Sequence, residues 1–136
     1  MQDGLLGTWK LDKDKSEFDA NHRPAEATLV FELDAQGAYV MKAEGTKENG
    51  ERVVERPQVF LVDGQEHEVP GFSGLRLVCE RLDGNAMRAE VKRDDGSVVG
   101  GGTYTLSPDG RTLTVTNFGY DSQLRQFQQK TYWERL

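Results

Sequence analysis

Six two-residue turn signals divide this chain into short segments, and they constrain its fold more than any other feature. Each ends in glycine: Gln36-Gly37, Asn49-Gly50, Asp63-Gly64, Asp83-Gly84, Asp95-Gly96 and Asp109-Gly110. The segments between them are rich in Val, Thr, Leu, Tyr and Phe, most of which favour strands. Because such dipeptides reach the positive φ of tight turns at little cost, the pattern predicts strand–turn–strand units repeated along the chain.

Within most of these segments apolar and polar residues alternate, which is typical of antiparallel strands with one dry face. We expect Pro57 to interrupt one strand, residues Asp63–Gly74 to form a loop over one end, and Ser16 to cap a short helical turn. Nine strands are predicted, at Leu5–Lys13, Glu26–Asp34, Ala38–Thr46, Glu51–Val62, Leu75–Leu82, Ala86–Arg93, Ser97–Leu106, Thr112–Phe118 and Arg125–Arg135.

The absence of a long helical pattern between these segments argues against parallel strands, which need helical crossovers. An open antiparallel sheet of this size would expose two long edges, and closure removes them. The fold class predicted is therefore all-β: a single antiparallel up-and-down β-barrel of about 8–10 strands, formed by one domain over residues 1–136. A two-sheet sandwich is the alternative.

Composition narrows the classes of function. With 136 residues, 36% hydrophobic and 29% charged, the chain is long enough to bury a core. A net charge of −6 argues against nucleic acid and anionic lipid as partners. No apolar run is long enough for a membrane span, and we expect no signal peptide at the start, which has neither a basic region nor an apolar stretch. We expect a secreted or periplasmic location if a leader was removed and a cytoplasmic one otherwise; the oligomeric state stays open.

Residues with reactive chemistry are few. Glu66-His67-Glu68 contains metal-ligand types, but neighbours on an extended segment point to opposite sides, and with His22 they do not make a converging set. Cys79 lies in an alternating strand and is expected to be a buried, inert thiol. Gly100-Gly101-Gly102 continues into a strand, which indicates a close backbone approach and not a phosphate loop. We therefore predict no metal, no cofactor and no enzymatic activity.

The two ends of the chain carry a second signature, Gly7-Thr8-Trp9 and Trp133-Glu134-Arg135. In a barrel the first and last strands are neighbours, so the Arg135 guanidinium can stack on the Trp9 ring. Trp9, Trp133 and Arg135 are thus predicted to close the barrel, a structural role.

At this point the chain resembles the lipocalin-like, or calycin, barrels, and more closely a family of small, largely uncharacterised bacterial lipocalin-like proteins. The resemblance implies the barrel fold, frequent export and, by analogy, a ligand inside. The last segment departs from the usual Tyr-Glu-Lys type of ending, a change that stacking tolerates. Five segments spread over the chain carry the resemblance: Gly7-Thr8-Trp9-Lys10-Leu11, Lys15-Ser16-Glu17-Phe18, Asp63–Gly71, Ser107–Thr114 and Trp133-Glu134-Arg135.

Alternation also predicts which side chains face the interior. Arg81 is a further candidate, as a partner for a ligand carboxylate, unless a bulge turns it outward. The leading hypothesis is binding of a small, partly hydrophobic or amphipathic ligand inside the barrel; a ligand-free structural or interaction barrel and an enzyme acting on a hydrophobic substrate are the alternatives. The predicted interior residues are apolar Phe31, Leu33, Tyr39, Met41, Met87, Val91, Tyr104, Val115 and Phe127, and polar Asn117, Gln129 and Thr131.

Overall fold

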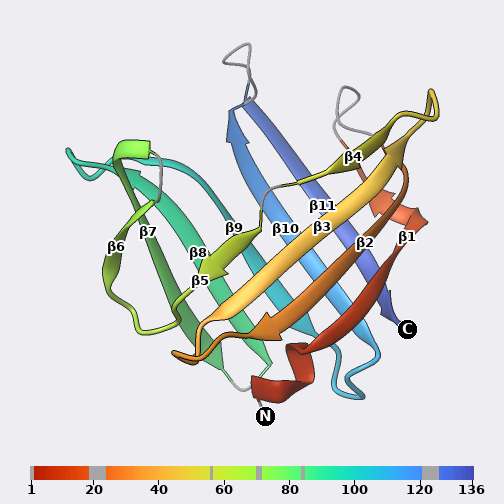
Figure 1. The fold of residues 1–136 in the computed structure, drawn as a ribbon, viewed down its shortest axis with the longest axis horizontal. Coiled ribbons are helices and arrows are strands. Elements are labelled where there is room, and N and C mark those ends of the chain that lie inside the picture. The colour runs from red at the N-terminus through yellow and green to blue at the C-terminus, as the bar shows by residue number, and fades with distance from the viewer. Residues whose placement is uncertain (1, 19–23, 56, 70–71, 84, 121–125) are drawn as a thin grey trace.

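The computed structural model describes residues 2–18, 24–55, 57–69, 72–83, 85–120 and 126–136, and these form an antiparallel β-barrel (Figure 1). Among them no helix is both long and apolar enough to cross a membrane. After a short 3-10 helix, η1 (Gln2–Leu5), the described strands are β1 (Gly7–Glu17), β2 (Pro24–Leu33), β3 (Tyr39–Lys47), β4 (Arg52–Val54), β5 (Gln58–Phe60), β6 (Glu66–Val69), β7 (Phe72–Asp83), β8 (Ala86–Arg93), β9 (Val98–Leu106), β10 (Thr112–Tyr120) and β11 (Gln126–Arg135).

The strands pair largely in chain order, and the two ends of the chain meet in the wall of the barrel. The hydrogen-bonded order is β4-β3-β2-β1-β11-β10-β9-β8-β7-β6, with β5 also pairing with β3. β1 and β11 lie side by side in the barrel wall (Figure 1). Their antiparallel ladder places Trp9 opposite Arg135. The predicted all-β antiparallel barrel, with its first and last strands side by side, is confirmed.

Two predicted segments differ from the structure in how they are divided. The strand expected over residues 51–62 splits into β4 and β5 around Pro57, which has no N–H to donate, and both pieces pair with β3. The expected loop over residues 63–74 contains β6, which pairs with β7. Among the described residues no ladder joins β6 to β4 or β5, so this side of the barrel is not closed by paired strands.

The predicted turns share one local chemistry. In the turn between β8 and β9, Gly96 has a φ of 88° and its N–H bonds the carbonyl of Arg93. Asp95 Oδ1 accepts a hydrogen bond from the Ser97 backbone N–H at 2.9 Å. Equivalent bonds from an Asp or Asn side chain to the N–H two residues on recur at Asp34, Asn49, Asp63, Asp83 and Asp109. These side chains favour the turn before any strand pairs, which is why the sequence signal is strong. Gly84 lies outside the described residues.

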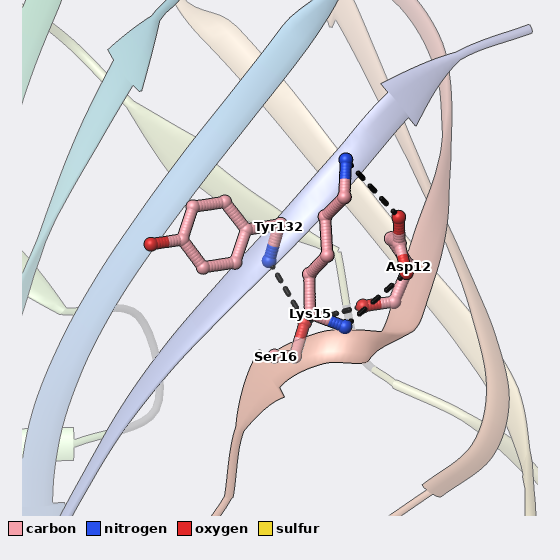
Figure 2. A network of polar contacts seen from close by, with 4 residues as sticks. All are labelled: Asp12, Lys15, Ser16 and Tyr132. Carbon is pink, nitrogen blue, oxygen red and sulfur yellow. Dashed lines mark hydrogen bonds and ion pairs between the residues drawn. The ribbon is translucent and has the colours of Figure 1, made fainter.

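A bulge in β1 is held by Ser16 (Figure 2). Pairing with β11 jumps from Asp12–Tyr132 to Glu17–Lys130, so β1 carries extra residues here. Ser16 Oγ accepts a hydrogen bond from the Tyr132 backbone N–H at 2.9 Å and donates to the Asp12 carbonyl at 2.7 Å. The hydroxyl therefore satisfies a backbone group next to the ladder break. The predicted helical turn capped by Ser16 is wrong, because this residue lies within β1.

Candidate functional site

A cavity of about 770 Å³ lies inside the barrel. This volume is within the range of small-molecule sites, and its wall is largely apolar with a few polar groups, as such sites require. The apolar lining consists of Leu11, Phe18, Pro24, Ala27, Leu29, Met41, Ala43, Val53, Phe60, Leu77, Ala89, Val91, Tyr104, Val115, Phe127 and Trp133. Glycine, polar and charged residues complete it: Gly45, Gly101, Gly102, Thr46, Gln58, Asn117, Gln129, Thr131, Glu44, Lys47 and Glu55.

The cavity is offset toward one end of the barrel. Its lining includes the first residue of β2, Pro24, and the last residue of β3, Lys47, together with Phe127 near the start of β11. Antiparallel pairing brings these positions to the same end, away from η1 and the β9–β10 turn (Figure 1). This end is therefore hollow.

The opposite end is filled by large side chains. The largest fully buried ones, Trp9, Phe31, Leu113 and Cys79, are 0–1% exposed. They belong to one core cluster that also contains Leu5, Tyr39, Met87 and Leu106. The Phe31 ring meets the Tyr104 ring edge-on, with centroids 6.1 Å apart, which is a favourable aromatic geometry. The interior is therefore filled at one end and hollow at the other.

A cation stacked on an indole covers the filled end. The Arg135 guanidinium lies 4.2 Å from the centroid of the Trp9 ring. Arg135 also donates to the backbone carbonyls of Gly110 at 3.0 Å and Leu6 at 2.8 Å, and to that of Gly4. The Trp9 indole N–H donates to the Leu5 carbonyl at 3.0 Å. One side chain thus ties β11 to the β9–β10 turn and to the N-terminal segment.

The structure separates the predicted interior residues into three groups. Met41, Val91, Tyr104, Val115, Asn117, Phe127, Gln129 and Thr131 line the cavity. Phe31, Tyr39 and Met87 face inward but are packed in the filled end. Leu33 differs from the prediction, because it is the last residue of β2 and 46% exposed. Alternation gives the correct face for Leu33 but not the depth at which the core ends.

Arg81 also lies outside the cavity, in contrast to its predicted role as a partner for a ligand carboxylate. It is exposed, and its Nη2 donates to the Tyr39 hydroxyl at 3.4 Å, a residue of the filled end. The pairing of β7 with β8 shifts register between Arg81 and Asp83. The bulge that the sequence analysis considered as the alternative is therefore present directly after Arg81.

Several lining residues were missed by sequence reasoning. Leu11 and Leu29 follow the same alternation as Trp9 and Phe31, so the signal that could have found them was present. Val53 and Phe60 lie in β4 and β5, where the interruption at Pro57 hides the alternation.

Polar groups of β10 and β11 form one wall of the cavity. Asn117 pairs with Gln129 across the ladder, and Val115 pairs with Thr131. The Trp133 indole N–H donates to Thr131 Oγ1 at 2.9 Å, and that hydroxyl donates to the Val115 carbonyl at 3.3 Å. Gln129 Oε1 is buried, and no described residue forms a hydrogen bond with it.

The ionisable groups inside the barrel are kept neutral by burial. Burial and the Asp63 carboxylate raise the pKa of the Cys79 thiol to about 12, so the thiolate needed for nucleophilic chemistry is suppressed at neutral pH. Burial, with smaller contributions from Cys79 and the Glu55 carboxylate, also raises the pKa of Tyr104 well above its ordinary value. The interior therefore disfavours negative charge.

The histidine that sequence reasoning considered as a ligand lies at the surface. His67 Nε2 is 2.9 Å from Asp63 Oδ2, and both side chains are partly exposed. The described residues contain no group of three or more His, Cys, Asp or Glu side chains placed to hold a metal ion. His22 lies outside the described residues.

Comparison with known proteins relates the chain to others through its fold. No family model and no curated protein sequence matches it. Solved structures that resemble it include the fluorescent protein UnaG, with a TM-score of 0.65 and 16% identity over 100% of both chains. As-p18, an extracellular fatty acid binding protein, matches with a TM-score of 0.56 and 16% identity, over 98% of this chain and 97% of its own. Zebrafish ileal bile acid-binding protein complexed with cholic acid matches with a TM-score of 0.58 and 12% identity, over 98% of this chain and 99% of its own.

At these identities the similarity shows the fold alone. The fold that the chain shares with these structures is an antiparallel β-barrel. The narrower resemblance to bacterial lipocalin-like proteins stays a prediction.

Proposed function

We propose that this protein binds a small, partly hydrophobic molecule in the hollow half of its barrel. The observation that carries the proposal is the cavity of about 770 Å³, whose apolar wall is interrupted by a polar strip from β10 and β11. Two of the structures with the same fold are named for binding fatty acids and bile acids, which supports a role of this class.

Binding fits the cavity better than catalysis does. Among the described lining residues the charged side chains Glu44, Lys47 and Glu55 are all exposed, so no carboxylate or ammonium group of this lining is shielded from water. Cys79 is held as a neutral thiol, and no described histidine lines the cavity. The polar side chains of the interior, such as Asn117 and Gln129, can orient a ligand but not transfer protons at neutral pH.

The test is uptake of the fluorescent apolar probe Nile red by the purified protein. We expect saturable fluorescence enhancement from the wild-type chain. Ala43 and Ala89 both line the cavity, so replacing them with tryptophan fills it from the wall. The A43W/A89W double variant should bind the probe at least about tenfold more weakly, a change of about 1.4 kcal/mol in binding free energy.

A matched control adds the same two indoles to the outer surface. Lys42 and Arg88 directly precede Ala43 and Ala89 in β3 and β8, and both are exposed. The K42W/R88W variant should bind the probe as the wild type does. Equal probe binding by wild type and A43W/A89W, with both folded by circular dichroism, would show that the probe binds elsewhere and would refute the proposal. No binding by any variant would favour the ligand-free barrel.

A further inference from the structure

The Gln129 carbonyl oxygen is a buried acceptor with no partner in the described part of the chain, and it belongs to a side chain that lines the cavity. Leaving a buried acceptor unpaired costs free energy, so such groups in folded proteins require an explanation. In a cavity of this size the natural explanation is a donor brought by the molecule that binds there.

No polar group of the described residues supplies that donor. Thr131, two residues along the same face of β11, donates its hydroxyl hydrogen to the Val115 carbonyl. The indole N–H of Trp133 is taken by Thr131 Oγ1. Thr131 and Trp133 thus pair with each other next to the filled end. Among the buried side-chain atoms that the structure describes, the acceptor left unpaired is Gln129 Oε1, nearer the hollow end of β11.

The charges around the cavity also select against an anionic ligand. Its described lining contains two carboxylates, Glu44 and Glu55, and one ammonium group, that of Lys47. The Lys47 ammonium is 3.6 Å from Glu51 and the Glu44 carboxylate is 2.9 Å from Arg52, so both are already paired. The Glu55 carboxylate is the remaining charge of the described lining. A carboxylate ligand would meet net negative charge at the rim and, at Gln129 Oε1, an acceptor to which it cannot donate.

Building on the proposed function, we infer that the ligand is a neutral amphipathic molecule whose polar end donates a hydrogen bond, a hydroxyl or an N–H, to Gln129. Its apolar part lies against side chains such as Met41, Phe60 and Val115. The cavity thereby selects alcohols or amides over the carboxylates that some barrels of the same fold are named for binding.

The experiment compares three probes that share one hydrocarbon chain: lauryl alcohol, lauric acid and methyl laurate, each used to displace Nile red at neutral pH. The alcohol is neutral and can donate, the acid is ionised and cannot, and the ester is neutral and cannot. We expect the alcohol to displace the dye at about tenfold lower concentration than either of the others, the factor expected for one buried hydrogen bond.

Two variants assign the preference to this side chain. Gln129→Leu should lose the preference for the alcohol over the ester, with displacement by each probe measured relative to this variant's own affinity for Nile red. Gln128→Leu, a change at the exposed neighbour on the outer face of β11, should keep it.

Displacement by lauric acid at or below the concentration needed for the alcohol would overturn the inference while leaving the proposed function intact. Equal displacement by all three probes would also overturn it, since water would then satisfy Gln129 as well as the ligand does. Absence of Nile red binding to the wild type would overturn the proposed function itself, and this inference with it.

Discussion

Replacing Trp9 with alanine is expected to lower the free energy of unfolding by about 3–5 kcal/mol, a large part of the stability of a typical domain. The indole is 0% exposed, donates to the Leu5 carbonyl at 3.0 Å and supports the Arg135 guanidinium at 4.2 Å. Its loss leaves a void in the filled end and removes the surface on which Arg135 is held. Equilibrium unfolding in urea, followed by far-ultraviolet circular dichroism, measures the change.

The conservative replacement Trp9→Phe serves as the control. It keeps an aromatic surface for Arg135 but removes the indole N–H and part of the packed volume, so we expect a smaller loss of about 1–2 kcal/mol. If Trp9→Ala destabilised the protein by less than about 1 kcal/mol, the first and last strands would not depend on this contact and the described closure would be wrong.

Replacing Gly101 with alanine should destabilise the protein by about 2–3 kcal/mol, although it adds a single methyl group. A Cβ atom at Gly101 would lie 2.6 Å from the backbone carbonyl oxygen of Ala89 and 3.3 Å from the Phe118 ring. The carbonyl belongs to β8, which pairs with β9 on this side, so relief requires the two strands to move apart. The same urea titration reports the change.

Gly100 provides the comparison within the same triplet. A Cβ atom added at Gly100 would lie 3.2 Å from its nearest neighbour, the Phe118 carbonyl oxygen, and small adjustments can relieve this contact. Gly100→Ala should therefore cost clearly less than Gly101→Ala. Equal effects at both positions would indicate a general loss from changing glycine in β9 and would contradict the close approach of β8.

The barrel could be predicted because its determinants are local. Asp95-Gly96 and the related dipeptides fix their turns through bonds between residues two or three apart, and alternation marks the inward face of each long strand. The pairing of the first strand with the last was predictable for a different reason. Trp9 and Arg135, at the two ends of the chain, can stack on each other only if their strands are neighbours.

The candidate site was less predictable because it depends on how far each strand extends past the core. Alternation could not separate Met41, which lines the cavity, from Leu33 at an exposed strand end. Nor could alternation show that Phe31 packs in the filled end of the barrel while the opposite end stays hollow. That difference depends on which side chains face each other across the barrel. Arg81 and Ser16 lie next to bulges, where the alternation of inward- and outward-facing side chains is interrupted.

Binding in the hollow half of the barrel is the central claim, and chemical-shift mapping by NMR with saturating Nile red tests it most directly. We predict shifts at the backbone amides of Ala43, Ala89 and Gln129, from three different strands around the cavity, with little change at Trp9 and Leu113 in the filled end. Shifts confined to the outer surface or to the filled end, or no shifts at all, would contradict it.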